Sequence, residues 1–266
     1  MAYRNQTPIT VATRIKSVLF FILYSLMGII HGMLCVLVGP FLPFEKRYAF
    51  VNIWTRSALW LLQHLNGVEI EIRGRENIPD DGRFVVMSNH QSQFETFALQ
   101  VLFSPQATVL KRELLWVPFF GWGLALQKPI KIDRKKANNA LKQIMRQGEE
   151  RLAENIPVVI YPEGTRQSPG ELGPFSTGGA MLAARAGVPV VPVAHNGGDC
   201  WPARSMLRIP GKIILTIGPP MPTRERKTRE INDAASQWIE ARFDEISREV
   251  GFSTSTAFDD NVADRP

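Results

Sequence analysis

Residues 84–95, FVVMSNHQSQFE, join a short apolar run directly to a polar segment. A continuous apolar run of this length is typical of a strand that is buried on both faces of a parallel sheet. His90 and Glu95 follow the strand closely, and α/β folds bind their ligands at the carboxyl ends of such strands. The segment therefore predicts both a buried sheet position and a candidate site at the edge of that sheet.

The rest of the chain repeats this pattern of apolar runs separated by amphipathic segments. The predicted strands are residues 68–74, 84–88, 107–110, 158–161, 190–194 and 212–218, and the predicted helices are residues 45–66, 137–154, 176–187 and 224–250. Ser176 and Thr177 are candidate caps for the third of these helices, which should end at Gly187. Strands that alternate with helices predict an α/β domain with a mixed, partly parallel sheet flanked by helices.

The N-terminal region contains an uncharged segment, residues 17–44, with no Asp, Glu, Lys or Arg. A helix of this length would measure roughly 42 Å, which exceeds the ~30 Å hydrocarbon thickness of a bilayer. Gly28, Gly32 and the Gly39-Pro40 pair should interrupt it, so we expect either one tilted membrane span or a helical hairpin in one leaflet. A cleaved signal peptide is disfavoured by the length, and a buried core helix by the lack of charges.

Basic residues flank the uncharged segment on both sides, which favours attachment with both ends on the cytoplasmic face of the inner membrane. We expect three parts: a membrane-attachment segment with an amphipathic helix in residues 1–66, an α/β domain in residues 67–252, and a disordered tail in residues 253–266.

The formal net charge is +6 and the sequence pI is about 9.5, which favours an anionic partner. Nucleic acid, anionic lipid headgroups and phosphorylated substrates all meet that condition. Lysines and arginines are scattered instead of being interleaved with aromatic residues on one face, so nucleic acid is disfavoured. Two cysteines and four histidines without an H-x-x-x-H spacing predict neither a disulfide framework nor a metal site.

The His90 and Glu95 pair has the chemistry of a general base. If the chain turns into a helix near Ser92, the two side chains fold back towards each other. A carboxylate that accepts one imidazole N–H leaves the other ring nitrogen free to take a proton from an alcohol. The alternative is a loop histidine next to a helix-capping acid.

Two further segments contain candidate binding residues. YPEGTR, residues 161–166, follows a predicted buried strand and ends in an arginine, whose planar fork binds phosphate bidentately; the alternative is an ordinary turn with a surface arginine. KRELLWVPFFGWG, residues 111–123, holds a dense group of large apolar residues. This group is either ordinary core, the lining of an acyl groove, or a surface in contact with the bilayer; the groove candidates are Trp116, Phe119, Phe120 and Trp122.

Taken in order, four blocks resemble the 1-acylglycerol-3-phosphate acyltransferase family, whose members have an N-H-x-x-x-x-D block, an arginine-containing block, an E-G-T-R block and a short V-P-V/I block. The matching residues here are Asn89-His90 with Glu95, and residues 130–134, 163–166 and 191–193. The resemblance covers roughly residues 68–218. The chain departs from the family in having Glu95 where the family usually has Asp, and this substitution leaves the acceptor open.

The resemblance implies an acyltransferase that makes phosphatidic acid for phospholipid biosynthesis. It implies His90 as general base and Glu95 as its orienting partner. Lys111, Arg134 and Arg166 would hold the acceptor phosphate, in a pocket shaped by Glu163, Gly164 and Thr165. An acyl group would pass directly from acyl-CoA or acyl-carrier protein to lysophosphatidic acid at the membrane, with no acyl-enzyme, metal or bound cofactor.

Two alternatives remain open at this point. One is a related acyltransferase with another acceptor: glycerol 3-phosphate, a lysophospholipid or an aminolipid. The other is a non-catalytic, basic membrane-binding protein. The absence of a G-x-S-x-G elbow or a P-loop disfavours a serine hydrolase or a nucleotide-binding enzyme.

Overall fold

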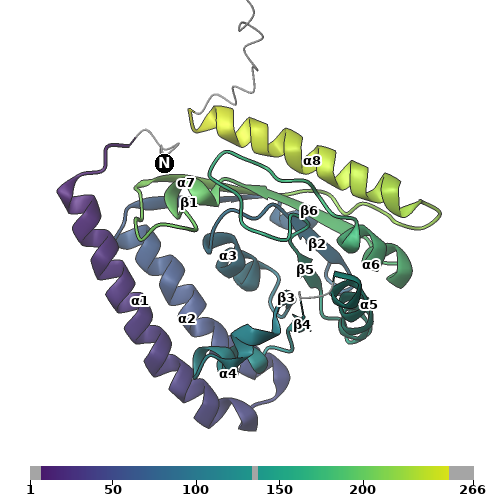
Figure 1. Ribbon diagram of the computed structural model, residues 1–266, viewed down its shortest axis with the longest axis horizontal. Helices are drawn as coiled ribbons and strands as arrows, with labels where there is room; N and C mark the ends of the chain where they lie inside the picture. Colours follow the sequence, from purple (N-terminus) through teal and green to yellow (C-terminus); the bar gives the residue numbers. More distant parts are fainter. Residues whose placement is uncertain (1–6, 134–136, 252–266) are drawn as a thin grey trace, which may run out of the picture.

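The six predicted strands, together with one further short strand, pair into a seven-stranded sheet in the computed structural model, which describes residues 7–133 and 137–251 (Figure 1). The strands are β1 Val68–Arg73, β2 Val85–Ser88, β3 Ala107–Lys111, β4 Ile130–Ile132, β5 Val158–Ile160, β6 Val190–His195 and β7 Gly211–Ile217. The α-helices are α1 Val11–Val38, α2 Phe44–His64, α3 Phe94–Leu102, α4 Phe120–Ala125, α5 Ala137–Ala153, α6 Gly178–Ala186, α7 Gly197–Cys200 and α8 Thr228–Glu249. Short 3-10 helices are η1 Gly39–Phe41, η2 Arg75–Asn77 and η3 Arg112–Trp116.

The sheet is mixed, as the sequence predicts. The strand order is β1-β7-β6-β2-β5-β3-β4. From β6 to β4 all neighbours pair in parallel, whereas β7 is antiparallel to β6 and parallel to β1. The carboxyl ends of five strands therefore meet at one edge of the sheet, and this edge receives the segments that follow β2, β5 and β6.

Helices cover both faces of the sheet, because the central strands are apolar on both sides. Val85 and Met87 of β2 pack into the core that contains residues of α5, α6 and α8. Phe84 and Val86 point to the other core, which contains residues of α2 and α3 and Phe20 of α1. Figure 1 shows α8, α6 and α5 on one side of the sheet and α1, α2 and α3 on the other. The short apolar run therefore places the site between two packed layers.

The uncharged N-terminal segment forms one continuous helix up to Val38 and no hairpin of its own; α1 forms a hairpin with α2 instead. The expectation that Gly28 and Gly32 interrupt it was wrong, since α1 continues through both. These glycines permit close packing instead: a β-carbon would lie 3.1 Å from the indole of Trp54 at Gly28, and 3.1 Å from the Phe119 side chain at Gly32. The Gly39-Pro40 pair does end the helix, and η1 leads into α2, which runs back beside α1 (Figure 1).

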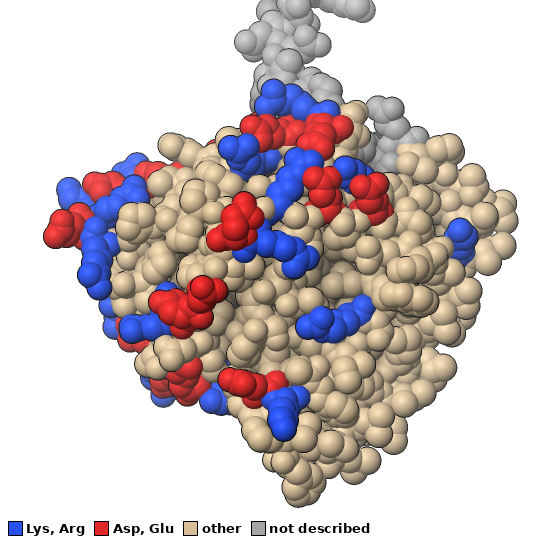
Figure 2. Space-filling model, turned by 180° about the vertical axis from the view of Figure 1, so that it is seen from behind, with Lys and Arg blue, Asp and Glu red and all other residues tan. Residues whose placement is uncertain are grey.

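The outer side of α1 is apolar and exposed. Among the described residues, one helical stretch, Val11–Phe41, is long and apolar enough to cross a membrane, and an 18-residue window within it has a mean hydropathy of 2.2. Ile22, Leu26 and Ile29 are each about half exposed. Figure 2 shows that charged side chains gather over the opposite part of the molecule, whereas the flank on which α1 lies is largely uncharged.

The predicted helix boundaries differ from the structure mainly at caps. Thr177 occupies the N-cap position of α6 without a side-chain capping bond, and the Ser176 hydroxyl donates instead to the Pro162 carbonyl at 2.8 Å. Gly187 ends α6 in the left-handed region, as predicted. The predicted tail, residues 253–266, lies outside the described residues.

Candidate active site

His90 and Glu95 are brought together by the turn from β2 into α3. His90 lies two residues beyond the end of β2, and α3 begins at Phe94, so Glu95 lies in the first helical turn. The two side chains fold back as predicted, with His90 Nδ1 2.8 Å from Glu95 Oε1. A helix N-terminus favours a carboxylate, which adds to the stability of this arrangement.

Glu95 is a fully buried carboxylate that accepts several hydrogen bonds. Besides His90, its Oε1 atom accepts from the backbone N–H groups of Gln91 at 3.0 Å and Ser92 at 2.8 Å. Burial raises the pKa of Glu95, but the neighbouring His195 and the hydrogen bonds from His90 and Ser92 outweigh it and hold this pKa below its ordinary value. Glu95 is therefore ionised at neutral pH and accepts the Nδ1 proton of His90.

The His90 imidazole is held on several sides. Its ring stacks on Tyr161, with centroids 4.2 Å apart and planes 16° from parallel. Its backbone carbonyl accepts from the Gln167 N–H at 2.8 Å. The side chain remains 15% exposed, and Nε2 has no hydrogen-bond partner in the described part of the chain. The ring is thus fixed in position while its second nitrogen stays accessible to a substrate.

Glu163 shapes this site by binding backbone instead of pointing to solvent. Its carboxylate accepts from the His90 N–H at 2.7 Å and from the Gly173 N–H at 2.8 Å. Burial raises the pKa of Glu163 to about 7, although both hydrogen bonds lower it. Glu163 therefore links the loop after β5 to the loop that carries His90.

The next three residues of this block form an exposed turn. The Gly164 N–H donates to the Tyr161 carbonyl at 3.0 Å, and Gly164 has a φ of 69°, a left-handed conformation that favours glycine. Thr165 accepts from the Gln167 side chain through its carbonyl and hydroxyl oxygens. Arg166 is exposed at the end of this turn, next in sequence to Gln167, whose backbone N–H binds the His90 carbonyl.

The other predicted cations lie farther along the same edge or outside the described residues. Lys111 is the exposed last residue of β3, and β5 separates β3 from β2. Arg134 falls in residues 134–136, whose structure is not described. On the neighbouring helix, a β-carbon at Gly179 would lie 3.0 Å from Met87, so this glycine allows α6 to pack on β2.

The predicted aromatic patch packs on the N-terminal hairpin. Phe119 lies against Gly32 of α1, and the Phe120 ring lies 5.7 Å from the Trp54 ring of α2. Trp116 is 68% exposed and Trp122 44% exposed. The patch is thus not ordinary sheet core, and its place beside the apolar α1 favours contact with lipid; its role as an acyl groove stays a prediction.

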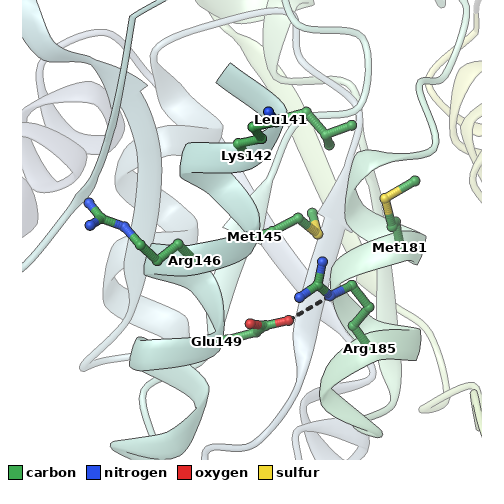
Figure 3. A pocket seen from close by; sticks show the side chains of 7 residues that line it. All are labelled: Leu141, Lys142, Met145, Arg146, Glu149, Met181 and Arg185. Carbon is green, nitrogen blue, oxygen red and sulfur yellow. Dashed lines mark hydrogen bonds and ion pairs between the residues drawn. The ribbon is translucent and has the colours of Figure 1, made fainter. Parts of the chain in front are cut away.

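Two surface grooves lie away from the residues predicted for catalysis and phosphate binding. One, of about 380 Å³, runs between α5 and α6, where an ion pair joins Glu149 to Arg185 at 2.7 Å (Figure 3). The other, of about 480 Å³, is lined by residues of α1 and α2, including Met27 and Trp60. No residue predicted for catalysis or phosphate binding lines either groove.

Sequence reasoning missed two residues that contact the dyad. Tyr161 was seen only as part of its block, and His195 was set aside with the other histidines. Tyr161 directly follows β5, and His195 is the last residue of β6. Their position at the carboxyl ends of parallel strands is the criterion that selected His90, and it would also have selected them. Within residues 7–133 and 137–251, no group of three His, Cys, Asp or Glu side chains is placed to hold a metal. The absence of a metal and of a cofactor stays a prediction.

The chain is similar to known acyltransferases. A family profile described as Acyltransferase matches residues 69–196. The chain is 47% identical over 237 residues to 1-acyl-sn-glycerol-3-phosphate acyltransferase of Pseudomonas aeruginosa, covering 88% of this chain and 92% of that protein. It is 32% identical over 178 residues to 1-acyl-sn-glycerol-3-phosphate acyltransferase alpha of Ovis aries, covering 66% and 62%.

A solved structure shares the fold. The crystal structure of the 1-acyl-sn-glycerophosphate acyltransferase PlsC from Thermotoga maritima matches with a TM-score of 0.74 and 22% sequence identity, covering 88% of this chain and 96% of that one. The mixed sheet flanked by helices is therefore the fold of this acyltransferase structure.

Proposed function

The chain belongs to the family of 1-acyl-sn-glycerol-3-phosphate acyltransferases, and we propose that it transfers a fatty acyl group from a thioester donor to the sn-2 hydroxyl of 1-acylglycerol 3-phosphate. The product is phosphatidic acid, the precursor of membrane phospholipids. The observation that carries this proposal is the His90 Nδ1 to Glu95 Oε1 hydrogen bond, which leaves Nε2 accessible at the carboxyl edge of the sheet. Family membership excludes the non-catalytic alternative.

The chemical step follows from this hydrogen bond. His90 Nε2 accepts the proton of the acceptor hydroxyl while the hydroxyl oxygen attacks the thioester carbonyl. Glu95 stabilises the imidazolium that forms. The tetrahedral intermediate collapses, the C–S bond breaks as the new C–O ester is retained, and the proton on His90 passes to the leaving thiolate. The base therefore returns to its neutral form, and no acyl-enzyme is needed.

The acceptor phosphate is proposed to bind at the exposed cations of the same edge. Arg166 is the strongest candidate, because Gln167, its neighbour, donates a backbone hydrogen bond to the His90 carbonyl. A guanidinium at this place would hold the phosphate while the hydroxyl reaches Nε2. Lys111 and Arg134 complete the predicted cationic set, and Gly164 and Thr165 form the turn that carries Arg166.

We further propose that the enzyme works at the inner membrane with its catalytic domain on the cytoplasmic side. The exposed apolar side of α1 and the exposed Trp116 and Trp122 support attachment to a bilayer. Acceptor and product are both lipids, so a site beside the bilayer shortens the path of each. Acyl-CoA and acyl-carrier protein are the proposed donors.

The test is acyl transfer by the purified full chain in detergent. Lysophosphatidate is supplied with acyl-CoA or with acyl-carrier protein, and the product is identified by mass spectrometry. Formation of phosphatidate supports the proposal, and the donor that gives the larger kcat/KM is assigned. Faster turnover of glycerol 3-phosphate, a phosphate-free lysolipid or an aminolipid would contradict the proposed acceptor. Absence of transfer to every acceptor would contradict the proposal as a whole.

A further inference from the structure

Asn89 and His195 join the two strands beside the dyad through three hydrogen bonds. The Asn89 side-chain amide donates to the His195 carbonyl at 2.9 Å, and its oxygen accepts the His195 backbone N–H at 3.1 Å. His195 Nε2 and the Asn89 carbonyl oxygen are 2.9 Å apart. Both residues are buried, one directly after β2 and the other at the end of β6. The loop that begins at Asn89 is therefore fixed to the neighbouring strand.

The hydrogen bonds of His195 define its tautomer. Its Nδ1 atom accepts the Gly197 backbone N–H at 3.0 Å, so this nitrogen carries a lone pair. The proton must then lie on Nε2, which donates to the Asn89 carbonyl. Both ring nitrogens are satisfied by a neutral imidazole. A protonated ring would place an Nδ1–H against the Gly197 N–H.

The same ring nitrogen lies near the catalytic carboxylate. Glu95 Oε1 accepts three hydrogen bonds, whereas the buried Oε2 atom has none among the described residues. His195 Nε2 lies 3.9 Å from Oε2, which is beyond hydrogen-bond distance but close enough for the N–H dipole to act on the charge. The carboxylate of Glu95 thus lies between two histidines.

We infer that His195 is a positioning residue for the dyad: it fixes Asn89 at the start of the loop that carries His90, and its imidazole lies next to the free oxygen of Glu95. This inference rests on the proposed role of His90 as general base. In this arrangement His195 neighbours Oε2 of Glu95, whereas His90 binds Oε1.

The Nε2 donor of His195 has a consequence for catalysis. Without it, the Asn89 carbonyl loses its bond to the neighbouring strand, and the loop that carries His90 is held less firmly. The hydrogen bond between His90 and Glu95, which orients the base, then depends on a less rigid loop.

Two variants of similar shape separate this role from simple packing. In His195→Gln, the longer amide reaches the Nε2 position and keeps a donor there. In His195→Asn, the shorter amide reaches only the Nδ1 position and loses that donor. A residue that served only to fill space would give similar results in both variants. Thermal unfolding of each variant reports any general loss of stability.

The experiment is NMR of the full chain in detergent with ¹⁵N-labelled histidine rings. The sequence contains four histidines, so each ring can be assigned with one variant. We expect His195 to remain a neutral Nε2–H tautomer through the titration. The ring ¹⁵N resonances of His90 should move in His195→Asn, because its loop is held less firmly, and should stay at their wild-type positions in His195→Gln.

The kcat/KM for acyl transfer gives a second readout. It should fall about tenfold in His195→Asn, roughly the effect of one lost hydrogen bond, and stay near the wild-type value in His195→Gln. An Nδ1–H or charged His195 in the wild type, or unchanged His90 resonances in a folded His195→Asn, would overturn the inference. Lack of acyl transfer by the wild type would contradict the proposed function alone, because the NMR titration does not depend on turnover.

Discussion

The Nδ1 atom of His90 lies 2.8 Å from Oε1 of Glu95, although this chain has a glutamate where the family usually has an aspartate. The additional methylene is accommodated because Glu95 lies in the first turn of α3 and its carboxylate folds back onto the N–H groups of Gln91 and Ser92. The longer side chain therefore preserves the dyad, and its second oxygen is left facing His195.

Replacing the proposed base should remove catalysis without unfolding the protein. His90→Ala is expected to lower kcat/KM by about 10²–10⁴, the range of general-base contributions. The matched control is His64→Ala on α2, whose ring bonds only the Trp60 carbonyl of its own helix. Acyl transfer to lysophosphatidate is measured for both. Near-equal activity of His90→Ala and His64→Ala would exclude the dyad.

Catalytic activity should depend on the charge of the Glu95 side chain more than on its length. Glu95→Gln can keep an oxygen where the backbone N–H groups point, but it is neutral and cannot stabilise an imidazolium as a carboxylate does. Glu95→Asp keeps the charge but shortens the reach by one bond. We expect activity in the order wild type, Glu95→Asp, Glu95→Gln, measured as kcat under saturating acceptor. The reverse order of the two variants would show that geometry, not charge, sets the requirement.

Glu163 should make stability fall as pH rises. Its folded-state pKa of about 7 exceeds the ordinary 4.5, so the folded protein binds more protons than the unfolded chain between these values. Stability is therefore lost as pH rises through that window. Glu163→Gln removes this dependence, so the variant should gain stability relative to wild type between about pH 5 and about pH 8. Urea unfolding at several pH values measures the trend.

Glu249 provides a control of opposite sign. Its bond to Arg73 holds the pKa of this carboxyl below the ordinary value, so its contribution is present at neutral pH and is lost as pH falls. Glu249→Gln should therefore lose stability relative to wild type as pH rises. If both glutamine variants followed the same trend, the raised pKa of Glu163 would be wrong.

Arg166 should matter for acceptor binding. Arg166→Gln is expected to raise KM for lysophosphatidate about tenfold or more, because a charge-assisted hydrogen bond to phosphate is lost. The control is Arg185→Gln, whose guanidinium pairs with Glu149 in the groove between α5 and α6. Initial rates over a range of acceptor concentrations distinguish the two. An unchanged KM in Arg166→Gln would remove this residue from the phosphate site.

The exposed side of α1 should decide membrane attachment. Serine at Ile22, Leu26 and Ile29 together is expected to weaken binding to anionic vesicles by about 3 kcal/mol or more, since three apolar side chains no longer enter lipid. Leu141→Ser, on α5, is the control. Flotation of the protein with vesicles measures the bound fraction. Equal flotation of the triple variant and Leu141→Ser would place the membrane contact elsewhere.

The sequence predicted the structure best where one physical cause produces both the local residue pattern and the element. The apolar runs at β2, β5 and β6 predicted buried strands because a strand covered on both faces must be apolar on both faces. The order of the blocks then placed His90 and the segment 161–166 at one edge. Prediction from the sequence was weakest at Gly28 and Gly32. A glycine in a helix is tolerated when a bulky partner, here Trp54 or Phe119, needs the space.

The sequence by itself determined the fold class, the edge of the sheet at which the chemistry lies, and the pairing of His90 with Glu95, since each depends on periodicity or on residues five positions apart. The contact between Glu95 and His195 was decided only by the tertiary structure. One hundred residues of chain separate them, and no local pattern encodes which strands become neighbours. Only the pairing of β2 with β6 brings the second histidine beside the buried carboxylate.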